Sequence, residues 1–200
     1  MREEEKIVND NHFQAQFAAL KDQISPHFLF NSLSVLASLV RKDPDLSEQF
    51  IDHLARAYRY ILEHKDDERV SLSDEMDFAR SYAFLLEVRF RRKFRVTFPP
   101  QEACRHFTLL PFTLQLLIEN AIRHNRMSAT EPLLVEMLVG EASVLTVRNN
   151  RQLRTQPEGD RRLGLANIRH RYALLTGLPV NVDETDKQFA VQIPLLRTDR

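Results

Sequence analysis

Two short segments place side chains that could carry out chemistry at fixed spacings, and the first is QISPHFLFN at residues 23–31. His27 directly follows Pro26, and Asn31 comes one helical turn after the histidine. A neutral imidazole is a good nucleophile, and an amide one turn away can fix its tautomer or orient its attacking nitrogen. Taken alone, a helical histidine is more often a surface or packing residue. The adjoining proline costs about 3 kcal/mol in a helix interior, so it predicts a bend that exposes His27 beside Asn31.

The second segment is ENAIRH at residues 119–124. Helical spacing puts Asn120 and His124 on one side of a helix, away from the apolar face that includes Leu117 and Ala121. Mg²⁺ carried by nucleotide phosphates needs only one or two protein oxygens, and Asn120 could supply one of them. The alternative is that these polar residues only solvate the outer face of the helix.

Apolar periodicity predicts a helical hairpin in the first third of the chain. One helical stripe changes phase across Pro26, and a turn at residues 41–45, with Asp43 or Asp45 as a helix N-cap, leads into another apolar face. The stripes are Phe13, Phe17, Leu20 and Ile24; Leu29, Leu33, Leu36 and Val40; and Ile51, Leu54, Tyr58, Ile61 and Leu62. Each helix exposes more apolar surface than one partner covers, so we expect a four-helix bundle formed by two chains.

After a charged linker at residues 64–69 the pattern changes to mixed helices and strands. We expect a helix capped by Ser71 or Ser73, a helix that opens at Pro111 and a last helix over residues 164–176. Strands are expected around residues 94–98, 133–139, 143–147, 180–182 and 189–193, with a polar segment over 149–162. Helices and strands do not alternate strictly, which favours an α+β sandwich. The predicted domains are therefore residues 1–69 and 70–200.

The composition excludes several classes of protein. With 43% hydrophobic residues the chain is typical of a soluble globular protein, and 28 basic against 28 acidic residues give no preference for nucleic acid. Cys104 is the single cysteine, which excludes an internal disulfide. No apolar run approaches the roughly 20 residues that span a bilayer. The opening MREEEK carries no capping signal, so we expect a helix continued from a longer protein.

The two chemical segments, in this order, resemble the LytS-like class of sensor histidine kinases. LKDQISPHFLFNSL matches the phospho-acceptor motif PHFLFN of that class, and LPFTLQLLIENAIRH matches the N box, ENAIKH, of its GHKL (Bergerat) ATP-binding domain. The resemblance covers nearly the whole chain and includes RAYRYIL with Arg56 and Arg59, EVRF with Glu87, Arg89 and Phe90, and the late GLANIRHRYALL.

The resemblance implies a role for each matching residue. His27 would accept the phosphate beside Asn31, Asn120 would hold Mg²⁺, and Glu119 would act on the proton of the reacting nitrogen. The implied ATP-binding residues are Asn120, His124, Asn149, Asn150, Arg161, Arg162, Gly164 and Asn167.

The sequence departs from the family at two places in the expected ATP site. Where the family has an aspartate-asparagine-glycine turn, this chain has Asn149, Asn150 and Arg151. Asparagine can accept from the adenine amino group and donate to a ring nitrogen, or can be an ordinary turn residue. The glycine-rich lid is reduced to DRRLGL, in which Arg161 and Arg162 either bind phosphate near a helix N-terminus or form a solvated surface run.

The implied function is a homodimeric protein-histidine kinase that autophosphorylates from ATP and Mg²⁺. The phosphate would pass to the aspartate of a response regulator, often of the LytTR type, and that partner rather than this chain would contact DNA. The chain would be the cytoplasmic part of an inner-membrane sensor whose sensing segment lies upstream of Met1. The alternatives are a catalytically weak signalling scaffold, motivated by the altered lid, and an ATPase without phosphohistidine.

Overall fold

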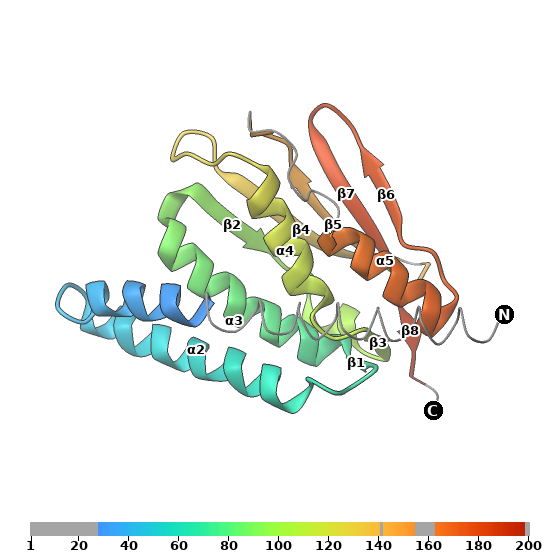
Figure 1. Cartoon of the computed structure of the whole chain (residues 1–200), viewed down its shortest axis with the longest axis horizontal. Helices are drawn as coiled ribbons and strands as arrows, with labels where there is room; N and C mark the ends of the chain where they lie inside the picture. The colour runs from blue at the N-terminus through green and yellow to red at the C-terminus, as the bar shows by residue number, and fades with distance from the viewer. Residues whose placement is uncertain (1–27, 141, 155–162, 199–200) are drawn as a thin grey trace, which may run out of the picture. The chain divides into compact units, whose positions relative to one another are not determined.

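The structure, a computed structural model, describes residues 28–140, 142–154 and 163–198 of the chain (Figure 1). The chain forms two compact units, which divide after Ile51 within helix α2 (Pro44–Glu63). His27, Arg161 and Arg162 lie outside the described residues. Their roles stay predictions, as does the domain boundary after Arg69. No helix within the described ranges combines the length and apolar character that a membrane span requires.

The first unit contains a helix over residues 28–39, which carries a half-buried Asn31, and the start of α2. Asp43 caps α2, because its Oδ1 accepts from the Leu46 backbone N–H at 3.0 Å. Of the two predicted caps, Asp43 is therefore the one used. Phe30 and Leu33 on the first helix are 68% and 47% exposed. These two apolar side chains of the first helix are thus largely exposed.

The second unit mixes helices and strands, which confirms the predicted α+β class. Its helices are α3 (Leu72–Phe90), α4 (Thr113–His124) and α5 (Leu163–Thr176), with short 3₁₀ turns at Arg91–Lys93 and Gln101–Cys104. Its strands are β1 (Val70–Ser71), β2 (Phe94–Thr97), β3 (Phe107–Leu109), β4 (Leu133–Gly140), β5 (Val144–Asn150), β6 (Asn181–Glu184), β7 (Gln188–Pro194) and β8 (Leu196–Arg197). Ser71 is the cap of α3, since its Oγ accepts from the Asp74 N–H at 3.0 Å.

The main sheet has the strand order β2-β4-β5-β7-β6, in which β2 and β4 are parallel and the other pairs antiparallel. Helices α3, α4 and α5 lie together over one face of this sheet (Figure 1). Alternating burial along β4 and β5 follows from that arrangement, because every second side chain points toward the helices. Leu145 and Val147 belong to the buried row of β5. A smaller antiparallel sheet, β1-β3-β8, was not predicted from the sequence.

The first turn of α4 is held by a carboxylate from another helix. Glu75 of α3 is fully buried and accepts from the backbone N–H groups of Phe112 at 3.1 Å and Leu114 at 2.9 Å. Phe112 has a left-handed backbone with φ of 64°, so the helix begins at Thr113 and not at Pro111 as predicted. Glu75 thereby satisfies two backbone donors that a helix N-terminus otherwise leaves without partners.

Two further side chains complete this buried cluster. The Tyr60 hydroxyl of α2 donates to Glu75, and the Arg171 guanidinium of α5 donates to the Pro111 carbonyl at 3.2 Å. Burial raises the pKa of the Glu75 carboxyl. Burial, followed by the charge of Glu75, raises the pKa of Tyr60, so its hydroxyl keeps the proton that it donates. The start of α4 is thus fixed by side chains of α2, α3 and α5.

We predict that Glu75→Gln lowers the free energy of unfolding by about 1–3 kcal/mol. Glutamine offers one acceptor oxygen, so its NH₂ group would face one of the two backbone N–H donors. That N–H group would be left without an acceptor. Urea denaturation measures the loss. Asp77→Asn, the same chemical change at an exposed site on α3, should change stability by no more than about 0.5 kcal/mol. Equal unfolding midpoints for the two variants would contradict the role assigned to Glu75.

Candidate functional site

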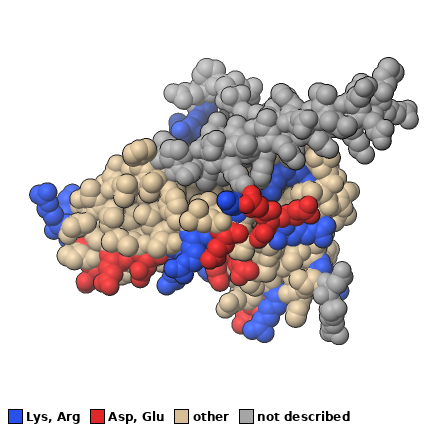
Figure 2. All heavy atoms as spheres, turned by 60° about the horizontal axis from the view of Figure 1, so that its bottom comes forward, with Lys and Arg blue, Asp and Glu red and all other residues tan. Residues whose placement is uncertain are grey.

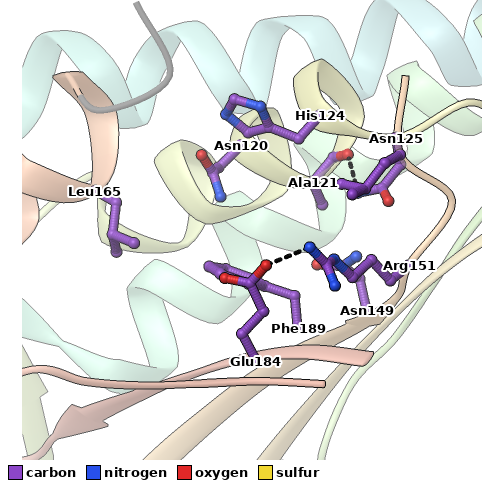
Figure 3. A pocket seen from close by; sticks show the side chains of 10 residues that line it. Asn120, Ala121, His124, Asn125, Asn149, Arg151, Leu165, Glu184 and Phe189 are labelled. Atoms are coloured by element: carbon purple, nitrogen blue, oxygen red, sulfur yellow. Dashed lines mark hydrogen bonds and ion pairs between the residues drawn. The ribbon is translucent and has the colours of Figure 1, made fainter. Parts of the chain in front are cut away.

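A cavity of about 260 Å³ lies beside the second half of α4 (Figure 3). The last residues of β5 and β6, the start of β7 and the start of α5 also line it. Its lining residues are Asn120, Ala121, His124, Asn125, Asn149, Arg151, Leu153, Leu165, Glu184 and Phe189. It therefore brings together Asn120, His124 and Asn149, three of the residues predicted for a nucleotide site. Within the described ranges, no group of three histidine, cysteine, aspartate or glutamate side chains is placed to hold a metal ion.

Strand register builds the floor of the cavity. Asn149 pairs with Val135 on one side and with Phe189 on the other, and Phe189 pairs with Glu184. These residues form one row across four strands. Asn149 follows Leu145 and Val147 in the inward-facing row of β5, and it is 6% exposed. The alternation of the strand thus turns the Asn149 amide toward the helices, where α4 closes the cavity.

Helix α4 supplies the opposite wall. Asn120 and His124 are one turn apart, so both side chains lie on the cavity side of the helix with Ala121 (Figure 3). Glu119 does not line the cavity. Its Oε1 accepts from the Tyr82 hydroxyl of α3 at 2.6 Å and from the Gln115 amide at 3.0 Å. Burial, and then the charge of Glu119, raises the pKa of Tyr82, which keeps the phenol protonated as a donor.

Asn125 ties the chain after β5 to the end of α4. Its Nδ2 donates to the Ala121 carbonyl at 2.9 Å, and its Oδ1 accepts from the Gln152 N–H at 2.7 Å. Arg154 adds two bonds, from its backbone N–H to the His124 carbonyl at 3.2 Å and from its Nε to the Asn125 carbonyl at 2.9 Å. The side chain of Asn125 is 3% exposed. This buried amide fixes one end of the cavity.

Arg151 and Glu184 place an ion pair in the same cavity. Arg151 lies two residues after Asn149, just past the end of β5, and residues two apart in an extended chain point to the same side. Its side chain therefore also turns inward. Its guanidinium pairs with Glu184 and donates to the Thr185 carbonyl at 3.0 Å. Neither residue was predicted as part of the site. The alternation that places Asn149 inward would also have identified Arg151, whereas Glu184 carries no comparable sequence signal.

The remaining predicted residues lie apart from the cavity lining. Asn150 faces the other side of β5, where its Oδ1 accepts from the Leu134 N–H at 2.8 Å and its Nδ2 donates to the Pro132 carbonyl at 2.9 Å. Gly164 and Asn167 stand in the first turns of α5, beside Leu165, which does line the cavity. The Asn167 Oδ1 is buried and has no hydrogen-bond partner among the described residues.

A second hollow of about 600 Å³ lies between α2 and α3. Basic and acidic side chains both line it, among them Arg56, Arg59, Glu63 and Asp77. The surface in Figure 2 likewise intersperses basic and acidic side chains. The two arginines of the RAYRYIL segment thus share their groove with carboxylates.

Comparison with known proteins gives a consistent family assignment. A model of the family described as histidine kinase matches residues 15–94. The sensor histidine kinase YpdA of Escherichia coli (strain K12) is 30% identical over 199 residues, which cover 92% of this chain and 35% of that protein. The sensor protein LytS of Staphylococcus haemolyticus (strain JCSC1435) is 28% identical over 148 residues, with 72% and 25% covered.

Similarity to solved structures is weaker. A chain titled a bacterial phosphotransferase has a TM-score of 0.48 at 12% identity, with 90% of this chain and 95% of that chain covered. The blue-light activated histidine kinase EL346 of Erythrobacter litoralis has a TM-score of 0.39 at 17% identity, with 87% and 62% covered. Both TM-scores are below 0.5, so these similarities do not define a common fold.

The motifs and the relatives agree on a class of signalling protein, the histidine kinases. Within that class, the chain is similar to the LytS-like sensor histidine kinases. It spans about a third or less of the length of the curated relatives described above.

We predict that Asn125→Ala frees the segment 151–154 from α4. The variant loses two hydrogen bonds and leaves the Gln152 N–H without its acceptor, at a cost of about 1–3 kcal/mol. Faster hydrogen exchange at the Gln152 and Arg154 amides would report this release. Asn181→Ala, the same substitution at an exposed position of β6, should leave exchange at both amides unchanged. Unchanged exchange in Asn125→Ala would show that other contacts hold the segment.

Proposed function

We propose that the chain is the kinase core of a two-component sensor, which binds ATP with Mg²⁺ and transfers the γ-phosphoryl group to His27. The observation that carries this proposal is the meeting of the N-box residues Asn120 and His124 with Asn149 in one cavity, in a chain similar to the LytS-like sensor histidine kinases. The second unit would then be the ATP-binding domain.

The cavity fits the base of a nucleotide. Its volume of about 260 Å³ lies just below the roughly 300–1,000 Å³ of typical small-molecule pockets, so it suits part of such a ligand. Asn149 Nδ2 donates to the Asn150 carbonyl at 2.7 Å, which directs its Oδ1 to the role of acceptor for a base amino group. Ala121, Leu165 and Phe189 supply apolar contact for the ring.

Asn120 is the residue that we assign to Mg²⁺. An amide oxygen is a ligand that Mg²⁺ accepts, and the ion needs few others from the protein because phosphates and waters complete its shell. Once bound, Mg²⁺ would neutralise the charge that develops on the phosphoryl oxygens. His124, one turn away on the same wall, would contact the nucleotide beside it.

The transfer needs a group that manages the proton of the histidine. An unprotonated imidazole nitrogen of His27 would bond to the γ-phosphorus, while the bond to the β–γ bridging oxygen breaks and ADP leaves with the electron pair. The proton on the other ring nitrogen then becomes acidic. We assign its removal to Glu119 Oε2, because both donors that orient this carboxylate, Tyr82 and Gln115, bind Oε1.

Dimerisation and partners follow the same proposal. The uncovered apolar residues Phe30 and Leu33 suit a bundle formed by two chains, and Leu62 on α2 is 67% exposed. Phosphorylated His27 would pass its phosphate to an aspartate of a response regulator, which we expect to be of the LytTR type. The chain would act as the cytoplasmic part of an inner-membrane sensor.

We predict that incubation of the chain with γ-labelled ATP and Mg²⁺ labels it in a form that acid removes and alkali spares, as expected for phosphohistidine. His27→Ala should abolish the label because it removes the acceptor. Asn120→Ala should reduce it at least about a hundredfold, in line with the loss of a group that positions transition-state charge.

Controls separate this activity from its alternatives. His170→Ala changes an exposed histidine of α5 and should label as the wild type does. Phosphate release that persists in His27→Ala would indicate an ATPase, and nucleotide binding without any label would indicate a signalling scaffold. Either result would overturn the kinase assignment.

We predict that Leu33→Arg converts a dimer into a monomer. An arginine in a bundle seam would bury a charge without a partner, which is strongly unfavourable. Sedimentation velocity measures the mass of the species. Ser34→Arg introduces the same side chain at the next exposed position of the helix, and it should remain dimeric. A wild-type chain that sediments as a monomer would refute the bundle.

A further inference from the structure

The family carries an aspartate where this chain has Asn149, so the cavity lacks a carboxylate at the expected place. The structure shows another carboxylate in the same cavity. Glu184, the last residue of β6, lies in the cross-strand row that also contains Phe189 and Asn149. Its carboxylate lies in the cavity beside the Arg151 guanidinium (Figure 3). The negative charge that is absent from β5 is thus present on β6.

Arg151 holds this carboxylate in place. The guanidinium pairs with Glu184 Oε1 and donates to the Thr185 carbonyl at 3.0 Å, and the Arg151 N–H donates to the Lys187 carbonyl at 2.9 Å. The arginine side chain is 20% exposed, whereas that of Glu184 is 50% exposed. The arginine is therefore the less exposed member of the pair, and the glutamate presents its carboxylate to the cavity.

The Glu184 carboxylate is a hydrogen-bond acceptor and the Arg151 guanidinium beside it is a donor. Together they complement the edge of a purine that presents a donor next to an acceptor. Adenine presents its 6-amino donor next to the N7 acceptor, whereas guanine presents two acceptors, O6 and N7. A carboxylate beside a guanidinium matches the first pattern. A guanidinium alone matches the second, because arginine binds guanine O6 and N7 through two parallel bonds.

We propose that Glu184, held by Arg151, accepts from the amino group of the base and makes the cavity select adenine over guanine. This inference rests on the proposed ATP binding. A carboxylate has acceptor positions on both oxygens, so the ion pair through Oε1 does not use up its capacity. Asn149 would accept from the other hydrogen of the same amino group. Arg151, where the family has glycine, would then be part of the recognition and not an obstruction.

The test is calorimetric titration of the full chain with the Mg²⁺ complexes of ATP, of GTP and of purine riboside triphosphate, which lacks the amino group. Glu184→Ala should weaken ATP binding about tenfold to a hundredfold, since a hydrogen bond to a charged acceptor is lost. Binding of purine riboside triphosphate should change little. GTP should bind as well as before or better, because the guanidinium is released.

Asp183→Ala is the matched control, because it removes an exposed carboxylate one residue away, on the other side of β6. It should leave all three affinities unchanged. Thermal unfolding checks the fold of each variant, and the isosteric Glu184→Gln replaces Glu184→Ala if the latter is unfolded. Its amide oxygen can still accept, so ATP binding should fall less than in the alanine variant.

The outcomes separate the two levels of the proposal. If the wild-type chain binds none of the three nucleotides, the proposed function fails. If the wild type binds ATP and Glu184→Ala binds it equally well, ATP binding stands and the role of Glu184 is refuted. An equal loss for ATP, GTP and the analogue would also refute it, because the residue would then shape the cavity without reading the base.

Discussion

The buried carboxylate of Glu75 is the contact on which the arrangement of the second unit depends. It accepts from two backbone N–H groups at the start of α4 and from the Tyr60 hydroxyl of α2. Arg171 of α5 binds the adjoining Pro111 carbonyl. A buried carboxylate is tolerated only where hydrogen bonds replace its hydration, and here the bonds come from two parts of the fold, α2 and the start of α4. The helix that carries Asn120 therefore begins at a place set by three other elements.

A second carboxylate repeats this logic further along α4. Glu119 is oriented by Tyr82 of α3 and by Gln115 one turn earlier. Both ends of the N-box helix are thus connected to other parts of the unit, its start through Glu75 and its end through Asn125. Rigid placement of this kind is what positional catalysis requires, because small displacements of a catalytic group cost large factors in rate. Helix α2 reaches this network through Tyr60, whose hydroxyl donates to Glu75.

The cavity owes its composition to strand register. The alternation of side chains along β5 would by itself have placed Asn149 and Arg151 on the inward face and Asn150 on the outward face. Leu145 and Val147 already mark the inward face of this strand. The same alternation cannot show that β7 lies between β5 and β6, which puts Phe189 beside Asn149 and Glu184 beside Phe189. Pairing order is a property of the whole sheet, and residues distant in sequence become neighbours only through it. For this reason the ion pair of Arg151 and Glu184 could not be found from the sequence.

By itself the sequence determined the α+β class, two candidate caps for each of two helices, the main strands and the resemblance to the LytS-like kinases, because these depend on local periodicity, hydrogen-bonding side chains and motifs. It also determined that Asn120 and His124 share one side of a helix, since a spacing of four residues is one turn. Only the tertiary structure decided that α4 begins after a left-handed Phe112, held by Glu75 from another helix. Only the tertiary structure placed a carboxylate of β6 in the cavity, because long-range pairing and burial, which no local pattern records, bring those groups together.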